Sequence, residues 1–307
     1  MAMEYRIYKL GFSTAVHFGS GSLTDIGNQL LADTIFSALC QETAADDEIE
    51  RLVKWAKAGE LLLSDGLPFV RETLYIPKPA VRVQTEQEGN SALKKHFKKL
   101  KYIPWDKLAA YLQGEIDPAA ENQRFRQLGQ PEMRTLAAGR NKAEAEPFFV
   151  GTYRFHKGSG LYIIAGFAAA EIKQQFEQLL QGVAISGIGG KRSAGLGKFK
   201  VKAADFAAEE LNVKAGVEPF YMNLSVAMAV EPELAEALQG ASYTLVKRSG
   251  FVASATYAPE NRRKRDFYAF QSGSCFWRPF AGGVFDVSGS GRHKVYRYAK
   301  PMFLEVR

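Results

Sequence analysis

The sequence predicts a mixed α+β protein, and three observations lead to that class. Short segments with the alternating pattern of strands are interleaved with amphipathic segments typical of helices along the 307 residues. Hydrophobic residues make up 46% of the chain and charged residues 24%, which is typical of a globular protein and excludes a disordered one. No apolar run approaches the roughly 20 residues of a membrane-spanning helix. The length allows two domains of ordinary size.

Outside the stretch 60–147, the first 205 residues are predicted to follow the order β-α-β-β-α-β. The segments are a strand at 5–10, a helix at 31–39 with a second amphipathic helix at 47–57, strands at 148–156 and 161–167 joined as a hairpin by residues 157–160, a helix at 171–180 and a strand at 198–202. This order is the ferredoxin-like arrangement, which RNA-recognition domains also use. We therefore expect a first ferredoxin-like domain over 1–205.

The stretch 60–147 is interpreted as a large insertion that carries mobile loops. It contains a short hairpin candidate at 61–76, a basic segment at 93–101 and a small helix near 105–112. Residues 115–147 are polar and weakly patterned. Nothing in this stretch predicts a continuous core.

Residues 206–307 are predicted to form a second α+β unit, for which a second ferredoxin-like domain is expected. An alternating strand over 222–230 opens it. The further elements expected are a short helix at 232–238 and strands at 243–246, 251–255, 266–271, 274–280, 294–297 and 302–306.

The charge distribution points to a polyanionic partner. The formal net charge is +7. Acidic residues are absent from three separate stretches, 178–204, 237–259 and 287–304, and each stretch contains basic residues beside glycine, serine or aromatic residues. Basic residues grouped in this way are typical of surfaces that bind nucleic acids. A generally basic surface without a specific partner is the alternative.

Motifs for catalysis, metals or cofactors are missing from the sequence. The four histidines have no metal-ligand spacing, and the two cysteines, Cys40 and Cys275, form no CxxC motif. The loop 187–197 is not a phosphate-binding loop of the Walker type, because Arg192 follows Lys191 where serine or threonine is required. We expect no catalytic residue, metal or cofactor. The N-terminus lacks the features of a signal peptide, so a cytoplasmic location is expected.

The glycine-rich loop 187–197 is the strongest candidate for anion binding. Five glycines, Gly187, Gly189, Gly190, Gly195 and Gly197, let the backbone approach a ligand and are expected to turn N–H groups outward. Lys191 and Arg192 add charge, and Ser193 adds a hydroxyl group. Such a loop can bind successive phosphates of a nucleic acid. A flexible surface loop is the alternative, and on either interpretation a valine at Gly189 is expected to leave the fold intact.

Three further segments carry candidate residues. His17, Gly19 and Ser20 lie in a glycine- and serine-rich loop, where a polar contact to RNA is expected. Lys247, Arg248 and Ser249 form a second basic segment. Asp33 is interpreted as a residue that stabilises the start of its helix. The run 261–265 is either a solvated turn or a phosphate clamp.

Several of these motifs together resemble one protein family. The glycine-rich loop is similar to the signature of the repeat-associated mysterious proteins, the RAMP superfamily of CRISPR systems. The whole chain resembles the family of the fourth subunit of the type III-A Csm complex. The matching segments are 16–19, 32–39, 187–199, 247–251, 271–274 and 292–298, which occur in family order over almost the full chain.

The resemblance implies a function as well as a fold. It implies two ferredoxin-like domains, a projecting thumb within 60–147, no nuclease activity and recognition of the repeat-derived 5′ handle of a guide RNA. It also implies contacts with the large signalling subunit and with a backbone RAMP subunit. The residues expected to contact the RNA are His17, Gly19, Ser20, Gly187, Gly189, Gly190, Lys191, Arg192, Ser193, Gly195, Gly197, Lys247, Arg248, Ser249, Arg292 and His293.

Two rival functions stay open at this point. The first is a guide-processing endoribonuclease of the same superfamily with His17 as acid or base, because such enzymes share the glycine-rich loop. The second is a general RNA chaperone, which rarely needs such a long ordered core.

Overall fold

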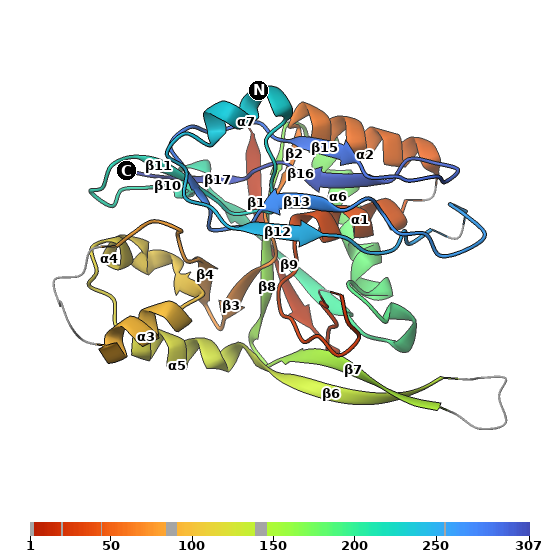
Figure 1. The fold of residues 1–307 in the computed structure, drawn as a ribbon, viewed down its shortest axis with the longest axis horizontal. Coiled ribbons are helices and arrows are strands. Elements are labelled where there is room, and N and C mark those ends of the chain that lie inside the picture. Colours follow the sequence, from red (N-terminus) through yellow and green to blue (C-terminus); the bar gives the residue numbers. More distant parts are fainter. Residues whose placement is uncertain (1–2, 20, 44, 84–90, 139–145, 255) are drawn as a thin grey trace.

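The structure is a computed structural model that describes residues 3–19, 21–43, 45–83, 91–138, 146–254 and 256–307 (Figure 1). It confirms the predicted α+β class, since helices accompany several mainly antiparallel sheets. Residue Ser20 and parts of the stretch 60–147, namely 84–90 and 139–145, lie outside the described residues. Within the described chain, no helix has the length and apolar character to cross a membrane.

A seven-stranded antiparallel sheet forms the centre of the N-terminal part, residues 4–206. Its spatial order is β5 (Tyr102–Pro104), β4 (Thr73–Pro77), β3 (Leu67–Val70), β8 (Ser159–Phe167), β1 (Glu4–Phe12) and β9 (Phe199–Phe206), with β2 (Leu61–Leu63) also paired to β8. Every residue of β8 is buried, because both faces of this strand are covered. The expected strands at 5–10, 161–167 and 198–202 are confirmed.

The two faces of this sheet pack against different layers. Tyr8, Leu10 and Ile163 face the helices α1 (Ala32–Gln41), α2 (Asp46–Ala58) and α6 (Ala170–Ser186), all of which were predicted. The alternate residues Ile7 and Tyr162 face α4 (Leu108–Leu112) and apolar side chains of the C-terminal part. The alternation along β1 therefore reflects two buried faces.

The interpretation of 60–147 as an insertion of mobile loops is wrong for much of this stretch. Strands β2 to β5 complete the central sheet, and Leu100, Ile103 and Leu108 bury against its second face. The expected hairpin exists as β3 and β4, and the expected small helix exists as α4 preceded by a 3-10 turn (Trp105–Lys107). The remaining helices are α3 (Ser91–Lys99) and α5 (Pro118–Phe125), followed by a 3-10 turn (Arg126–Leu128).

A long two-stranded ribbon extends away from the central sheet (Figure 1). It consists of β6 (Gly129–Ala138) and β7 (Glu146–Phe155). The expected pairing of strands 148–156 and 161–167 as a hairpin is wrong, because β7 pairs with β6 and β8 pairs with β1 and β3. The ribbon leaves Met133 and Phe149 exposed, so its strands lack the clear one-sided pattern by which β6 could have been predicted.

The C-terminal part, residues 207–307, is built from small sheets. A four-stranded sheet has the order β10 (Asn212–Val213), β17 (Phe303–Val306), β11 (Phe220–Asn223) and β14 (Cys275–Phe276). Two ribbons accompany it, β12 (Leu245–Arg248) with β13 (Phe267–Phe270) and β15 (Gly283–Asp286) with β16 (Tyr296–Ala299). The helical elements are α7 (Glu231–Ala237), which was predicted, and a 3-10 turn (Ala208–Leu211).

Some strands of this part are shorter than expected. The strand predicted over 222–230 ends at Asn223, because the Asn223 side chain accepts the Ser225 N–H at 3.2 Å and bends the chain. The strand predicted at 251–255 is reduced to a single bridge between Phe251 and Arg263. The strand predicted at 274–280 is reduced to the two residues of β14, and β15 was not predicted.

The two parts are joined through shared hydrophobic clusters on both faces of the central sheet. The Phe36 ring on α1 lies 5.4 Å from the Tyr298 ring on β16. The Leu63 N–H donates to the Tyr298 hydroxyl at 2.9 Å. Because these contacts join β2, α1 and β16, the segments that line the space between the two parts are held in fixed positions.

Candidate nucleic-acid interface

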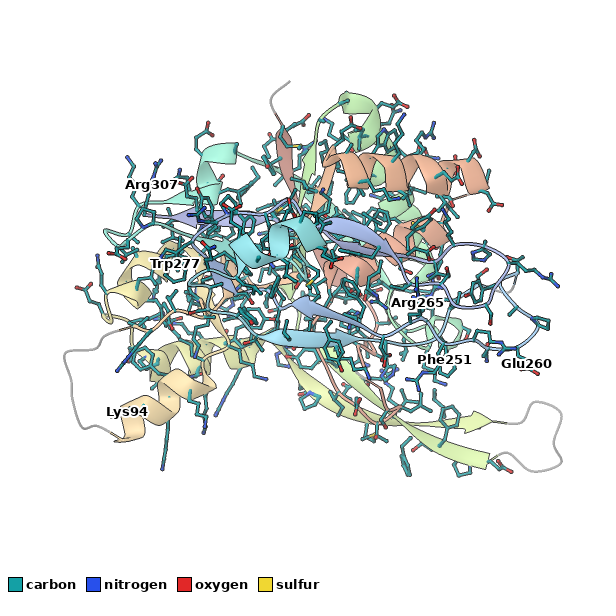
Figure 2. All side chains as sticks on the ribbon, turned by 45° about the horizontal axis from the view of Figure 1, so that its top comes forward. Lys94, Phe251, Glu260, Arg265, Trp277 and Arg307 are labelled. Carbon is teal, nitrogen blue, oxygen red and sulfur yellow. The ribbon has the colours of Figure 1, made fainter. Side chains whose placement is uncertain are left out.

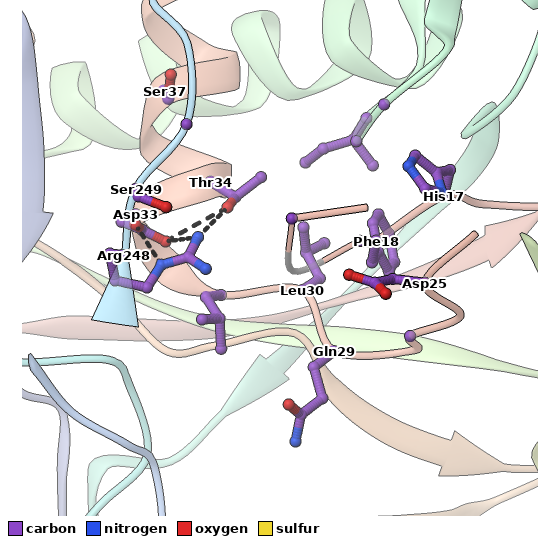
Figure 3. Close-up of a pocket in the computed structure, with 18 of the residues that line it drawn as sticks. His17, Phe18, Asp25, Gln29, Leu30, Asp33, Thr34, Ser37, Arg248 and Ser249 are labelled. Carbon is purple, nitrogen blue, oxygen red and sulfur yellow. Dashed lines mark hydrogen bonds and ion pairs between the residues drawn. The ribbon is translucent and has the colours of Figure 1, made fainter. Parts of the chain in front are cut away.

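A cleft of about 860 Å³ lies between the N-terminal and C-terminal parts and is called the central cleft below (Figure 3). Its lining comes from the loop 17–31, helix α1, the glycine-rich loop at 188–192, and the segments 246–251 and 263–264. Of the residues predicted from the sequence, it brings together His17, Gly19, Gly189, Gly190, Arg192, Lys247, Arg248 and Ser249. Three segments far apart in the chain therefore meet in one place.

The glycine-rich loop directs several backbone N–H groups inward. The N–H groups of Gly187, Gly190 and Gly197 donate to the carbonyl oxygens of Val183, His17 and Ala15 at 2.8 to 2.9 Å. The prediction that the glycine N–H groups turn outward to bind phosphates is therefore wrong at these three positions. Ser193 and Gly195 belong to a 3-10 turn (Arg192–Ala194) and its C-terminal end, and neither lines the cleft.

The glycines are required by close packing. Gly189 has φ +93°, and a Cβ there would lie 2.8 Å from the His17 carbonyl oxygen. A Cβ at Gly197 would lie 2.1 Å from the Ile188 carbonyl oxygen. The expectation that a valine at Gly189 leaves the fold intact is therefore wrong, because the loop packs against the segment at His17 with no room for a side chain.

His17 holds the wall of the cleft together. Its side chain is buried, and Nδ1 lies 2.6 Å from the Gly151 carbonyl oxygen on β7. The ring lies so close to Gly190 that a Cβ there would come within 2.5 Å of it. His17 thus connects β7 with the glycine-rich loop.

Lys191 and Arg192 point in different directions. The Lys191 ammonium lies 4.8 Å from the centre of the Phe148 ring on β7, and the residue does not line the cleft. Arg192 does line it, and its Nη2 donates to Gln41 Oε1 on α1 at 2.5 Å. The two basic residues are therefore not equivalent, although they are neighbours in the sequence.

An ion-pair cluster forms the floor of the cleft. Arg248 donates through Nε and Nη2 to the two carboxylate oxygens of Asp33, both at 2.9 Å (Figure 3). Arg297 Nη1 donates to the same Asp33 Oδ2. Asp33 lies in the first turn of α1, as predicted, but it does not cap the helix, because the capping position is Leu31 and the Asp33 carboxylate binds the two guanidinium groups.

The electrostatics of this cluster favour an added anion. Burial alone would raise the pKa of Asp33, but Arg248 and Arg297 outweigh it and hold the pKa below its usual value. Burial and the nearby Arg297 charge lower the pKa of Lys264. Three cations therefore face one carboxylate at the floor of the cleft.

The segment after β12 adds a partly neutralised cation and an exposed ring. The Lys247 ammonium lies 2.6 Å from Asp266 Oδ2. Phe251 has 60% of its surface exposed, and the Arg263 guanidinium lies 5.8 Å from the centre of its ring. Phe251, Glu260 and Arg265 lie on the loop between β12 and β13, and Glu260 marks the part of this loop that reaches the edge of the molecule (Figure 2).

Arg292 and His293 are not brought into the cleft. They lie between β15 and β16, and neither lines it. The Arg292 N–H donates to the Tyr257 carbonyl oxygen at 3.0 Å, and the His293 ring packs edge-on against the Tyr257 ring at 5.1 Å. The structure gives these two residues a local packing role.

Four basic residues that line the cleft, Lys101, Arg263, Lys264 and Arg297, were not among the residues expected to contact RNA. Arg263 and Lys264 lie in the basic run 261–265, for which a clamp was one of two interpretations. Arg297 lies in the C-terminal motif, but its burial beside Asp33 has no signature in the sequence. Among the described residues, no group of three or more metal-ligating side chains was found.

Known proteins are similar to this chain over almost its whole length. A family model described as the CRISPR Csm4 C-terminal domain matches residues 217–306. A protein from Mycobacterium tuberculosis described as CRISPR system Cms protein Csm4 is 38% identical over 304 residues, and the match covers 98% of each chain. The protein of the same description from Streptococcus thermophilus is 31% identical over 313 residues, and the match covers 99% of each chain.

Solved structures share the fold. The chain matches a Csm3–Csm4 subcomplex of the type III-A CRISPR-Cas interference complex with a TM-score of 0.63 and 16% identity, covering 98% of each chain. It matches a Csm1–Csm4 cassette in complex with pppApA with a TM-score of 0.60 and 17% identity, covering 98% of this chain and 97% of the other. With near-complete coverage at 38% and 31% identity to the curated relatives, the chain belongs to the Csm4 family of CRISPR proteins.

Proposed function

We propose that this protein is a non-catalytic guide-RNA-binding subunit of a type III-A CRISPR interference complex and holds the repeat-derived 5′ handle in the central cleft. The observation that carries the proposal is the convergence of the loop at His17, the glycine-rich loop and the segment 246–251 on one cleft. All three had been predicted separately as RNA contacts.

The composition of the cleft supports a polyanionic ligand. Two acidic side chains line it, Asp25 and Asp33, against seven basic ones, namely Lys101, Arg192, Lys247, Arg248, Arg263, Lys264 and Arg297. Basic side chains bind phosphates and so position the RNA backbone without reading its sequence. The exposed Phe251 ring offers a face on which an unpaired base can stack.

The fold proposed for this function is a pair of ferredoxin-like units with a thumb. The four strands β9, β1, β8 and β3 lie side by side in the order fourth, first, third and second along the chain, with α1 and α6 on one face. We assign the thumb to the β6–β7 ribbon, because it extends from the body of the molecule and its base is bonded to the wall of the cleft. The second ferredoxin-like unit would comprise residues 206–307.

The partners proposed are the large signalling subunit and a backbone subunit of the RAMP superfamily. The similar solved structures contain Csm4 with Csm1 in one case and with Csm3 in another. We propose that this chain contacts both kinds of subunit and so bridges them while it holds the RNA.

The test is the RNA that accompanies the protein. Expressed with its neighbouring subunits, the protein should copurify with short RNAs that share one 5′ end. The double variant Arg192→Ala and Lys264→Ala should lower the RNA retained per complex, because two cations of the cleft are removed. Lys54→Ala, on the exposed side of α2, is the matched control and should retain the parental amount. RNAs with scattered 5′ ends would contradict the proposal.

The rival function, a guide-processing endoribonuclease, has its own test. The proposal of no catalysis is supported by the burial of His17 and by its Nδ1 contact with Gly151, which commit the ring to the structure. Purified protein should leave a repeat-containing precursor RNA intact. Cleavage at one site that is abolished by His17→Ala would establish the rival.

A further inference from the structure

Arg297 presents buried hydrogen-bond donors that have no partner. The residue is 5% exposed and lines the floor of the central cleft. Nη1 donates to Asp33, but Nε and Nη2 form no hydrogen bond in the described structure. Unsatisfied buried donors are rare in proteins and cost free energy, especially on a charged group.

The unpartnered atoms have the arrangement of an anion site. Nε and Nη2 lie on the same edge of the guanidinium plane, so their N–H bonds run parallel and match two oxygens of one acceptor. Arg248 uses this same pair of atoms to bind both oxygens of Asp33. The same edge of Arg297 has no acceptor, and neighbouring protein atoms cover it, so a ligand in the cleft reaches it once those atoms shift.

Lys264 supplies a second cation at the same place. Its backbone N–H donates to the Gly250 carbonyl oxygen at 2.9 Å, which fixes the residue beside the cleft. Both oxygens of Asp33 are already bonded to the two arginines, and no acidic side chain other than Asp33 and Asp25 lines the described cleft. The Asp33 carboxylate orients the two arginines without cancelling the positive charge.

We propose that Arg297 and Lys264 form a phosphate-binding recess at the floor of the central cleft, in which the free edge of Arg297 binds two phosphate oxygens and Lys264 acts as a point charge. This inference rests on the proposed function, since the guide RNA supplies the phosphate. The phosphate is either a backbone diester or a 5′-terminal monoester, and both present the oxygens that the recess requires.

The experiment uses the full-length chain and the guide RNA recovered from the assembled complex. A series of RNAs is made in which a single backbone linkage is replaced by an uncharged methylphosphonate, and each RNA is prepared with either a 5′-hydroxyl or a 5′-phosphate. Binding to the parent is compared with binding to Arg297→Lys and to Lys264→Met. Arg297→Lys keeps the charge beside Asp33, and Lys264→Met leaves that ion-pair cluster untouched.

For the parent protein, one modification should weaken binding about 10-fold or more, because it removes hydrogen bonds to a charged group. The sensitive position is an internal linkage if the recess holds a diester, and it is the loss of the 5′-phosphate if the recess holds a monoester. For Arg297→Lys and for Lys264→Met, the affinities for the unmodified and the modified RNA should differ by no more than about twofold. The altered recess no longer binds the phosphate that the modification removes. Arg265→Met is the control, because Arg265 is the next residue but is exposed and donates to the Asp286 carbonyl oxygen.

The outcomes separate this inference from the proposed function. Sensitivity that stays at parental size in both variants would overturn the recess, while RNA binding itself would still support the function. Absence of guide-RNA binding by the parent chain, alone and in the complex, would overturn the function as well. Reduced sensitivity in Arg265→Met would also contradict the inference, because it would place the effect outside the recess.

Discussion

Two buried aspartates join α1 and its surroundings to the C-terminal part, and they do so in different ways. Asp33, in the floor of the cleft, is 4% exposed and binds the guanidinium groups of Arg248 and Arg297. Asp65, in the junction behind it, is 3% exposed and accepts the backbone N–H groups of Ala32 and Val226 at 2.8 and 2.9 Å.

The partners decide the charge that each carboxyl carries. Asp33 is ionised, because the arginines outweigh the effect of burial and lower its pKa. Burial raises the pKa of Asp65 to about 7, because its two N–H donors compensate the loss of water only in part. The junction around Asp65 is thus held by hydrogen bonds to a carboxyl group that is partly protonated near pH 7. The floor of the cleft instead contains an ionised carboxylate between basic side chains, where an anionic ligand can bind.

The largest effect is expected from removal of the Asp33 carboxylate. Asp33→Ala leaves Arg297 buried without a counter-charge, and the free energy of unfolding should fall by about 3–5 kcal/mol. Urea denaturation of the purified chain measures the change. Glu72→Ala, which removes an exposed carboxylate that pairs with Lys9 at 3.3 Å, is the control and should cost about 1 kcal/mol or less. A loss below about 1 kcal/mol for Asp33→Ala would show that the cluster is not a structural unit.

A smaller, pH-dependent effect is expected from Asp65. Because its folded pKa of about 7 lies above the unfolded value of about 4, the protonated carboxyl stabilises the fold below about pH 4. This contribution should be lost as the pH rises to about 7 and should amount to roughly 2–4 kcal/mol. The measurement is the free energy of unfolding between pH 4.5 and 8 for the parent and for Asp65→Asn.

Comparison of the parent with Asp65→Asn separates the titration of the Asp65 carboxyl group from that of the other ionisable groups. Asp33 has a lowered pKa and therefore contributes in the opposite sense, with stability present above the unfolded pKa and lost as the pH falls. The difference between parent and Asp65→Asn should decline from pH 4.5 to pH 7 and then stay constant. A difference that is independent of pH would mean that Asp65 is ionised throughout, like Asp33.

The smallest effect is expected from replacing basic residues in the walls of the cleft. These replacements should leave the contacts of Asp65 in the junction unchanged. Arg192→Ala should reduce the slope of log affinity for guide RNA against log salt by about 0.7, since one cation that faces the cleft is lost. Lys191→Ala should change the slope less, because this lysine packs on Phe148 outside the lining. Asp65→Asn should not change the slope. Equal effects of the two basic residues would argue that the RNA passes outside the cleft.

The comparison also shows which features of the fold and of the cleft could be predicted from the sequence and which could not. Strand β1 and helices α1, α2 and α6 follow from local periodicity, because each has faces that are buried in a regular pattern, whereas β9 is buried only at Phe199 and Phe206. The glycine-rich loop and the segment at Lys247 were found from composition alone. The ion pair between Asp33 and Arg297 could not be found, because it depends on a sequence separation of 264 residues that only the folded chain closes.

The errors have physical causes as well. The glycines at 187–197 were assigned to ligand contact, but Gly187, Gly190 and Gly197 satisfy their N–H groups inside the protein. The pairing of β7 with β6 escaped prediction because the outer part of the ribbon leaves Met133 and Phe149 exposed, and burial at Val150 and Phe155 marks only the inner part of β7.

The most direct test of the central claim is to locate the handle on the protein. The assembled complex would be prepared with guide RNA that carries photo-crosslinkable nucleotides in the handle, and the crosslinked peptides of this chain would be identified by mass spectrometry. We predict crosslinks in 17–29, 188–192 and 246–251, the segments that meet in the central cleft. Crosslinks confined to the loop 287–295, with none in those three segments, would contradict the assignment of the cleft as the binding site.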